Sequence, residues 1–267
     1  MHFARLFLAC GGSALAFVLL VGLLCIALRR IEALTRTPML DVILSLLTWV
    51  PWAACAWAGG WAGLLGCVLG QMVALYLWCF IHEVMHKDTP GGRTIANFID
   101  RHVGRWRNHL ALWATLVVLP VFWLIRLATA TIFWPLIWLL GFPRYRQSEW
   151  INVSRQKFGG LVGHDLVWCL YCDWMTGVYS LGAEMLRNVE SFWCPIRYYD
   201  GKKCENCKID FPDIANGWVP ADGNMADVEK VMQEKYGDGH REWFGHPARL
   251  TVKGEPLVPS PGTPGEG

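Results

Sequence analysis

Five consecutive residues, His82-Glu83-Val84-Met85-His86, form the clearest chemical pattern in this chain. Side chains four residues apart lie on one face of a helix, so His82 and His86 could bind one metal ion together. Glu83 could then act as the general base on a water molecule bound to that ion. Zinc suits these ligands, with one further protein ligand and an open position for water. The pattern therefore predicts zinc-dependent hydrolysis, provided that a third ligand is found.

The order of elements around this pattern resembles the membrane-embedded heat-shock peptidases, which belong to the zincin-type HExxH metallopeptidases. In that family HExxH follows N-terminal membrane spans, a hydrophobic hairpin comes next, and a glutamate on a later helix completes the site. Here the pattern also follows apolar runs, residues 110–142 form the next apolar run, and Glu184 comes later. The resemblance implies that His82, His86 and Glu184 bind zinc and that Glu83 is the catalytic base.

The same residues also have a non-catalytic interpretation. A helix that leaves the membrane into a basic loop often carries polar side chains at the level of the lipid headgroups. Glu83 could then pair with Lys87, four residues further along the helix.

Five cysteines lie close together in the polar half of the chain, at Cys169, Cys172, Cys194, Cys204 and Cys207. The CxxC spacing lets two thiolates bind one ion, and the lysines beside Cys204 and Cys207 favour thiolates. Their partners in a structural zinc site are expected to be Cys169 and Cys172, or Cys194 with one of Asp213, His240 and His246. An iron–sulfur cluster is less favoured, because the cysteines do not form a compact run.

The segment Trp168-Cys169-Leu170-Tyr171-Cys172 resembles the active-site loop of thioredoxin-like proteins. The resemblance implies a dithiol redox function, although the segment has helical spacing and no clear strand before it. Free structural thiols in a reducing compartment are the simplest alternative.

The elements that must position these residues are mainly apolar helices. The chain of 267 residues is 54% hydrophobic and 17% charged. About 20 apolar residues can span a bilayer, which predicts membrane spans at residues 6–28, 42–58 and 61–81. A tight turn is expected at Gly59-Gly60, between the second and third spans.

Residues 110–142 are apolar but too long for one straight span, and they contain Arg126. A charge is costly at the centre of a bilayer. We therefore expect a hairpin of two short helices with Arg126 near the turn.

Basic residues predict the orientation of these spans. Residues 29–41 and 87–109 are rich in Lys and Arg, and the linker at Gly59-Gly60 has none. Positive loops stay in the cytoplasm, which places the N-terminus outside. If residues 110–142 are a hairpin, the C-terminal domain is cytoplasmic too. If they are one tilted span, that domain is outside and its cysteines could oxidise.

Residues 143–255 have the composition of a small soluble domain, which we expect to be α+β, cysteine-rich and zinc-binding. An amphipathic helix is predicted at Leu161–Glu190 and a β-hairpin at Phe192–Asp210. A short helix should begin at Gly223-Asn224 and end at Gly237. Residues 256–267 are rich in Pro and Gly and are expected to be disordered.

The sequence as a whole predicts an α-helical, multi-pass integral membrane protein. Its small net charge of +2 does not favour nucleic acid as a partner. The favoured function is a zinc-stabilised cytosolic domain that docks a partner protein in a membrane complex. The alternatives are a membrane zinc metallopeptidase and a dithiol redox or metal-handling membrane protein.

Overall fold

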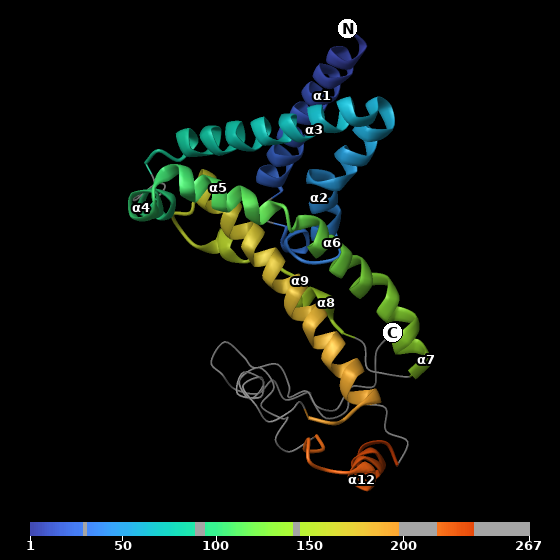
Figure 1. Cartoon of the computed structure of the whole chain (residues 1–267). Coiled ribbons are helices and arrows are strands. Elements are labelled where there is room, and N and C mark those ends of the chain that lie inside the picture. Colours follow the sequence, from blue (N-terminus) through green and yellow to red (C-terminus); the bar gives the residue numbers. More distant parts are fainter. Residues whose placement is uncertain (29–30, 89–93, 141–144, 198–217, 238–267) are drawn as a thin grey trace. The chain divides into compact units, whose positions relative to one another are not determined.

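The computed structural model describes residues 1–28, 31–88, 94–140, 145–197 and 218–237, and in these ranges it is built from helices (Figure 1). The α-helices are α1 His2–Ala27, α2 Met39–Leu47, α3 Trp49–Met85, α4 Thr94–Val103, α5 Arg105–Leu116, α6 Leu119–Leu127, α7 Phe133–Leu140, α8 Gln147–Trp150, α9 Gly163–Trp193 and α12 Met225–Tyr236. Shorter helical turns are η1 Glu32–Thr35, η2 Ala128–Ile132 and η3 Arg155–Lys157. Extended pairing within the described ranges is limited to two isolated bridges, Arg36–Asn152 and Ile196–Val219.

Three helical segments are long and apolar enough to cross a membrane: His2–Ala27, Trp49–Met85 and Arg105–Leu140. In the 18-residue apolar windows of these segments, only 17%, 28% and 11% of the residues are buried inside the protein. Apolar surface of this extent is unfavourable in water, which indicates that it faces lipid. The predicted spans 6–28 and 61–81 fall largely within α1 and α3, whereas the predicted span 42–58 is divided at Thr48, where α2 ends and α3 begins.

The second of these segments is divided at Gly60. Its backbone there has φ 55° and ψ −141°, a conformation that favours glycine. Figure 1 shows the chain leaving α2 through the first part of α3, turning, and continuing in a new direction. The turn predicted at Gly59-Gly60 is therefore found, and α3 has two arms, residues 49–59 and 61–85.

α1 packs closely against the second arm of α3. A Cβ atom added to Gly66 would overlap the carbonyl oxygen of Phe7, and one added to Gly70 would overlap that of Gly11. Further along both helices, Gly22 faces the indole ring of Trp78. The contacts advance in the same direction along both helices. The two helices therefore run parallel, and their C-terminal ends lie at the same end of the pair.

The third segment does not turn where we expected. Its α-helix is interrupted at Val117-Val118, just before Pro120, which has no N–H to continue the hydrogen-bond ladder. From Leu119 to Leu140 the helical backbone continues through α6, the π-helical η2 and α7. The turn predicted near Arg126 is therefore wrong.

Arg126 is instead buried within this helical stretch, at 6% exposure. Its guanidinium donates to the hydroxyl of Thr129 at 3.2 Å, and that hydroxyl donates to the carbonyl of Arg126 at 3.0 Å. These bonds connect the end of α6 to η2. A π-helical turn widens the helix locally, and here it coincides with the buried charge.

The chain groups into two compact units. One unit contains Met1–Trp123 and Arg146–Tyr179, and the other contains Leu124–Tyr145 and the chain from Ser180. In the first unit, the N–H of Thr37 donates to Ile151 at 3.2 Å, and that of Val153 donates to Thr35 at 2.8 Å. The polar segment after Arg146 therefore lies beside the loop that follows α1.

The two predicted C-terminal helices are confirmed. α9 begins at Gly163 and ends at Trp193, close to the predicted 161–190. α12 begins after Asn224, whose side chain accepts the N–H of Ala226 at 2.8 Å, while Asp227 accepts the N–H of Asn224 at 2.9 Å. Reciprocal bonds of this kind form a capping box. The helix ends at Gly237, as predicted.

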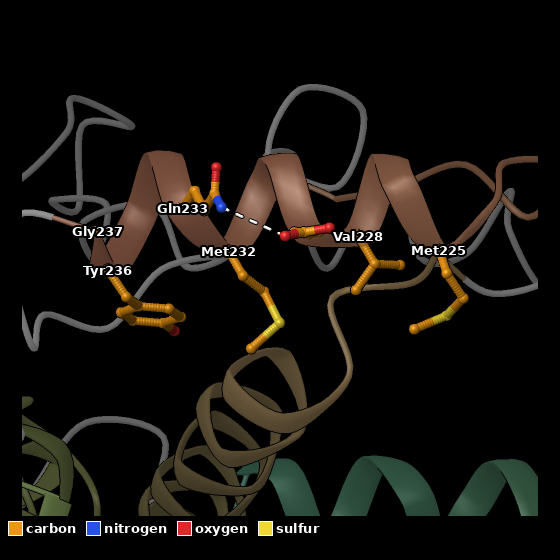
Figure 2. Close-up of a pocket in the computed structure, with 7 residues that line it drawn as sticks. Met225, Val228, Met232, Gln233, Tyr236 and Gly237 are labelled. Atoms are coloured by element: carbon orange, nitrogen blue, oxygen red, sulfur yellow. Dashed lines mark hydrogen bonds between the residues drawn. The ribbon is translucent and has the colours of Figure 1, made fainter.

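One face of α12 is apolar. Met225, Val228, Met232 and Tyr236 project from the same side of the helix (Figure 2), and they line a shallow pocket. The ring of Tyr236 lies 5.1 Å from that of Phe192, near the end of α9. The predicted β-hairpin at Phe192–Asp210 and the tail at 256–267 fall largely or wholly outside the described residues.

Candidate functional site

The HExxH residues lie at the C-terminal end of α3, where the membrane helix stops. The ring of His82 is 9% exposed and lies between two other rings. Trp78 stacks on it with centroids 4.8 Å apart, and His86 stacks on it at 4.2 Å. The aromatic neighbours therefore hold the His82 ring in one orientation.

His82 and Glu83 both accept hydrogen bonds from the start of α9. The N–H of Gly163 donates to Nδ1 of His82 at 3.1 Å, and the N–H of His164 donates to Oε1 of Glu83 at 3.1 Å. The first N–H groups of a helix have no partners within it. A carboxylate at this end is also favoured by the helix dipole. The HExxH segment therefore caps the N-terminus of α9.

Gly163 makes this capping possible. Its φ is +49°, which glycine adopts at little cost. A Cβ atom at this position would overlap Cγ and Oε1 of Glu83. The side chain of Glu83 reaches the helix end only because residue 163 lacks a side chain.

The ring nitrogens show how this arrangement relates to zinc binding. Nδ1 of His82 accepts the N–H of Gly163, so this nitrogen is occupied while the hydrogen bond is made. Nδ1 of His86 lies 2.9 Å from the carbonyl oxygen of His82, which can only accept, so this nitrogen carries the hydrogen of His86. Nδ1 of each histidine is therefore engaged by a backbone group, and zinc binding by His82 and His86 stays a prediction.

Across the described ranges, no three or more His, Cys, Asp or Glu side chains are arranged to hold a metal ion. Glu184, the expected third ligand, is a buried residue of the second unit, at 7% exposure. Its role as a ligand, and that of Glu83 as a catalytic base, stay predictions.

Asp165 extends the same capping pattern to α4. Its Oδ2 accepts the N–H of Ile95 and its Oδ1 accepts the N–H of Ala96, each at 3.0 Å. The carboxylate is buried, at 5% exposure, and both of its oxygens are used at the start of α4. We call His82, Glu83, Gly163, His164 and Asp165 the helix junction. It joins the end of α3 to the starts of α9 and α4.

Aromatic residues pack around the helix junction. Nε1 of Trp168 donates to Nε2 of His164 at 2.9 Å, and the ring of His109 meets that of His164 edge-on at 5.7 Å. Trp113 meets Trp168 edge-on at 6.2 Å and donates to the hydroxyl of Tyr76 at 2.6 Å. These contacts hold α5 against both α3 and α9.

The five expected zinc-binding cysteines are only partly described. Cys169 and Cys172 lie on α9, half-buried, and Cys194 is exposed just after it. All three are free thiols. Cys204 and Cys207, which belong to both proposed ligand sets, lie outside the described residues. The zinc site stays a prediction, as does the less favoured iron–sulfur cluster.

The surroundings of Cys169 bear on the dithiol redox hypothesis. Burial raises the pKa of the Cys169 thiol, and a hydrogen bond with Arg155 offsets only part of that rise. Redox-active cysteines usually have a lowered pKa, because the thiolate is the reactive form. The position of Cys169 within α9 therefore favours a structural thiol.

No family model, curated protein or solved structure matches this chain. The function must therefore be inferred from the helix junction and the membrane helices alone. The capping roles of Gly163 and Asp165 were not predicted from the sequence. A glycine and an aspartate at the start of an amphipathic helix were the available signal, because such residues are common at helix N-termini.

Proposed function

We propose that the protein is a multi-pass membrane protein that holds a cysteine-rich, zinc-binding segment at the membrane surface, where this segment docks a partner protein. The observation that carries the proposal is the pair of hydrogen bonds from Gly163 and His164 to His82 and Glu83. Through them, the end of an apolar helix holds the start of the helix that leads to Cys194, Cys204 and Cys207.

Three features support the proposal that loops 29–41 and 87–109 and the start of α9 lie on the same side of the membrane. α1 and the second arm of α3 are parallel, which fits loops 29–41 and 87–109 lying on the same side. The segment after Arg146 contacts the first of these loops through Thr35 and Thr37. The basic residues of both loops favour the cytoplasm. We therefore assign the helix junction and the start of α9 to the cytoplasmic surface. This assignment requires that the segment Arg105–Leu140 enters the membrane without crossing it, because α4 before it and α9 after it meet at the helix junction.

Zinc would supply the stability that a short cysteine-rich segment cannot obtain from its own core. Structural zinc is commonly held by four cysteine or histidine ligands, and its binding energy drives folding of small domains. Cys204 and Cys207 would provide two thiolates, and Cys169, Cys172 or Cys194 the others. The helix junction contributes no zinc ligand in this proposal.

Zinc analysis of the purified full-length chain tests the proposal. We expect about one zinc ion per chain, the stoichiometry of a single four-ligand site. Cys204→Ser with Cys207→Ser should abolish zinc binding, whereas His82→Ala with His86→Ala should leave it unchanged. Loss of zinc in the histidine variant, with retention in the cysteine variant, would favour the metallopeptidase instead.

Docking is tested in the native membrane by the size of the complex that contains the chain. The wild-type chain should migrate in a complex larger than itself, and the cysteine variant should migrate as the free chain. A matched control is Cys25→Ser, which removes a thiol of α1 that the proposal does not use. Equal complex sizes for wild type and the Cys204/Cys207 variant would contradict the docking function.

A further inference from the structure

α4 presents large apolar side chains on its outer surface. Ile95, Phe98, Ile99 and Val103 are 46%, 62%, 37% and 42% exposed, and Trp106 just beyond the helix is 81% exposed. The residues on the helix recur at intervals of three or four, which places them along one side. A helix of only ten residues therefore carries a continuous apolar face that the first unit does not cover.

The orientation of this face is fixed by the other side of the helix. Ala96 is buried, at 4% exposure, and the carboxylate of Asp100 accepts the side-chain N–H of Asn108 at 2.7 Å. Asp165 holds the N–H groups of Ile95 and Ala96. α4 is thus attached to α5 by one bond and to α9 by two. Its apolar face cannot turn inward while these bonds are made.

The position of α4 along the chain limits what can cover this face. α4 lies between two segments that are long and apolar enough to cross a membrane, Trp49–Met85 and Arg105–Leu140. Only residues 86–93 separate the end of α3 from α4, and only Gly104 separates α4 from α5. If those segments are in the membrane, α4 must lie at its surface.

The charges beside the apolar face match the chemistry of that surface. Arg101, Arg105 and Arg107 are exposed, and Arg101 is in the last turn of α4. Helices with an apolar face, basic flanking residues and a tryptophan lie in the interface between headgroups and acyl chains. Basic residues there attract anionic lipids.

We propose that α4 and Trp106 form an interfacial helix that inserts its apolar face among the lipids and binds anionic headgroups through Arg101, Arg105 and Arg107. The proposal rests on the membrane insertion in the proposed function but not on zinc or on docking. Because Asp165 joins α4 to the start of α9, binding of anionic lipid at α4 also stabilises the helix junction.

Hydrogen exchange of the full-length chain in lipid nanodiscs tests this proposal. The nanodiscs contain phosphatidylcholine alone or phosphatidylcholine with phosphatidylglycerol. We expect the backbone of residues 94–106 to exchange more slowly when phosphatidylglycerol is present, and high salt to remove the difference. Peptides from α12 should show no dependence on lipid charge.

Variants separate the apolar and charged contributions. Each Arg→Gln change at Arg101, Arg105 or Arg107 should reduce the lipid-dependent protection roughly fivefold, the effect of one basic residue near an anionic surface. Phe98→Ser should speed exchange of α4 in both lipids. Asn97→Ser is the matched control, because Asn97 is exposed on a different side of the same helix. Lys230→Gln, on α12, is the control for loss of a positive charge.

Equal exchange of α4 in both lipids, unchanged by the arginine variants, would overturn the proposal. Protection that depends on the number of chains per nanodisc and not on lipid charge would assign the face to a second copy of the chain. Slow exchange within α1 and α3 shows in the same experiment that the chain is inserted. Failure of insertion is thereby distinguished from failure of the lipid-binding proposal.

Discussion

Glu83, in the last turn of an apolar helix, accepts the backbone N–H of His164 at 3.1 Å, although 81 residues separate the two in the chain. The contact joins a membrane helix to the helix that precedes the cysteine-rich segment. It also uses the one carboxylate that an HExxH enzyme would need as its base. The structural role of the helix junction can be tested separately from any metal.

Replacements of Glu83 should destabilise the start of α9 most when the new side chain cannot accept a hydrogen bond. Glu83→Ala removes the acceptor and should lower the free energy of unfolding by about 0.5–2 kcal/mol, as for other helix caps. Glu83→Gln keeps an acceptor oxygen, so its free energy of unfolding should fall by less. Hydrogen exchange at residues 163–167, together with thermal unfolding, measures both effects. Equal losses for the two variants would contradict a capping role.

Gly163→Ala should be among the most destabilising glycine substitutions in the first unit. An alanine with φ of +49° is strained by roughly 1–2 kcal/mol, and its Cβ would also displace Glu83. Gly104→Ala has a positive φ but open space around the added Cβ, so it should show backbone strain alone. Gly159→Ala has open space and no positive φ and should be nearly neutral.

Thermal unfolding in detergent should rank these three glycine variants with Gly163→Ala the least stable. Only this variant should also increase hydrogen exchange at the start of α9. If Gly104→Ala and Gly163→Ala lose equal stability, contact with Glu83 adds nothing to the cost of the strained backbone.

Gly66→Ala should weaken the contact between α1 and α3. The added Cβ would overlap the backbone of Phe7, and relief by separating the helices should cost about 1–3 kcal/mol. Gly12→Ala is the matched control on α1, because an added Cβ there meets nothing within 4 Å. Alanine also favours helix over glycine by up to about 1 kcal/mol, so this control should be neutral or stabilising. Unfolding in mixed micelles measures both variants.

Tyr171 should make the stability fall at high pH. Burial, with Cys172 nearby, raises the pKa of Tyr171 to about 12 from an ordinary value of 10. Between these values the unfolded chain loses the phenolic proton more readily than the folded chain does. The contribution of Tyr171 is therefore fully present below pH 10 and is lost as the pH rises toward 12.

Tyr171→Phe should flatten the stability profile across that pH range. At neutral pH the variant should lose only the hydrogen bond from the Tyr171 hydroxyl to the carbonyl of Thr115, which is 3.2 Å long. That loss is worth about 1 kcal/mol. Thermal unfolding at a series of pH values, with tyrosinate absorbance, gives both quantities. An unchanged slope in the variant would assign the pH dependence to other groups.

The local features of this fold could be predicted from the sequence. Apolar runs identified α1 and the second arm of α3, although the predicted span 42–58 is divided at Thr48, and Gly60 marked the turn within α3. Asn224 and Gly237 correctly marked the ends of α12. Each of these features depends on residues within a few positions of one another, so the chain needs no distant partner to specify them.

The turn predicted near Arg126 is wrong because a hydrogen bond within the helix accommodates the buried charge. The sequence predicts a turn at this charged residue, because a turn avoids the cost of burying the charge. In the structure Arg126 stays within the helix and donates to Thr129, where the backbone widens into a π-helical turn. A hydropathy pattern shows that Arg126 is charged. It does not show that the hydroxyl of Thr129 accepts a hydrogen bond from the guanidinium.

The helix-capping contacts of the HExxH residues were decided by the tertiary structure. The sequence by itself determined that His82, Glu83 and His86 share the end of an apolar helix, since helical spacing requires it. It could not show that α9 would begin beside them, because their partners Gly163 and His164 are 81 residues away. Side chains able to bind a metal can equally cap a helix. Which of these they do depends on the groups that the fold brings within hydrogen-bonding distance.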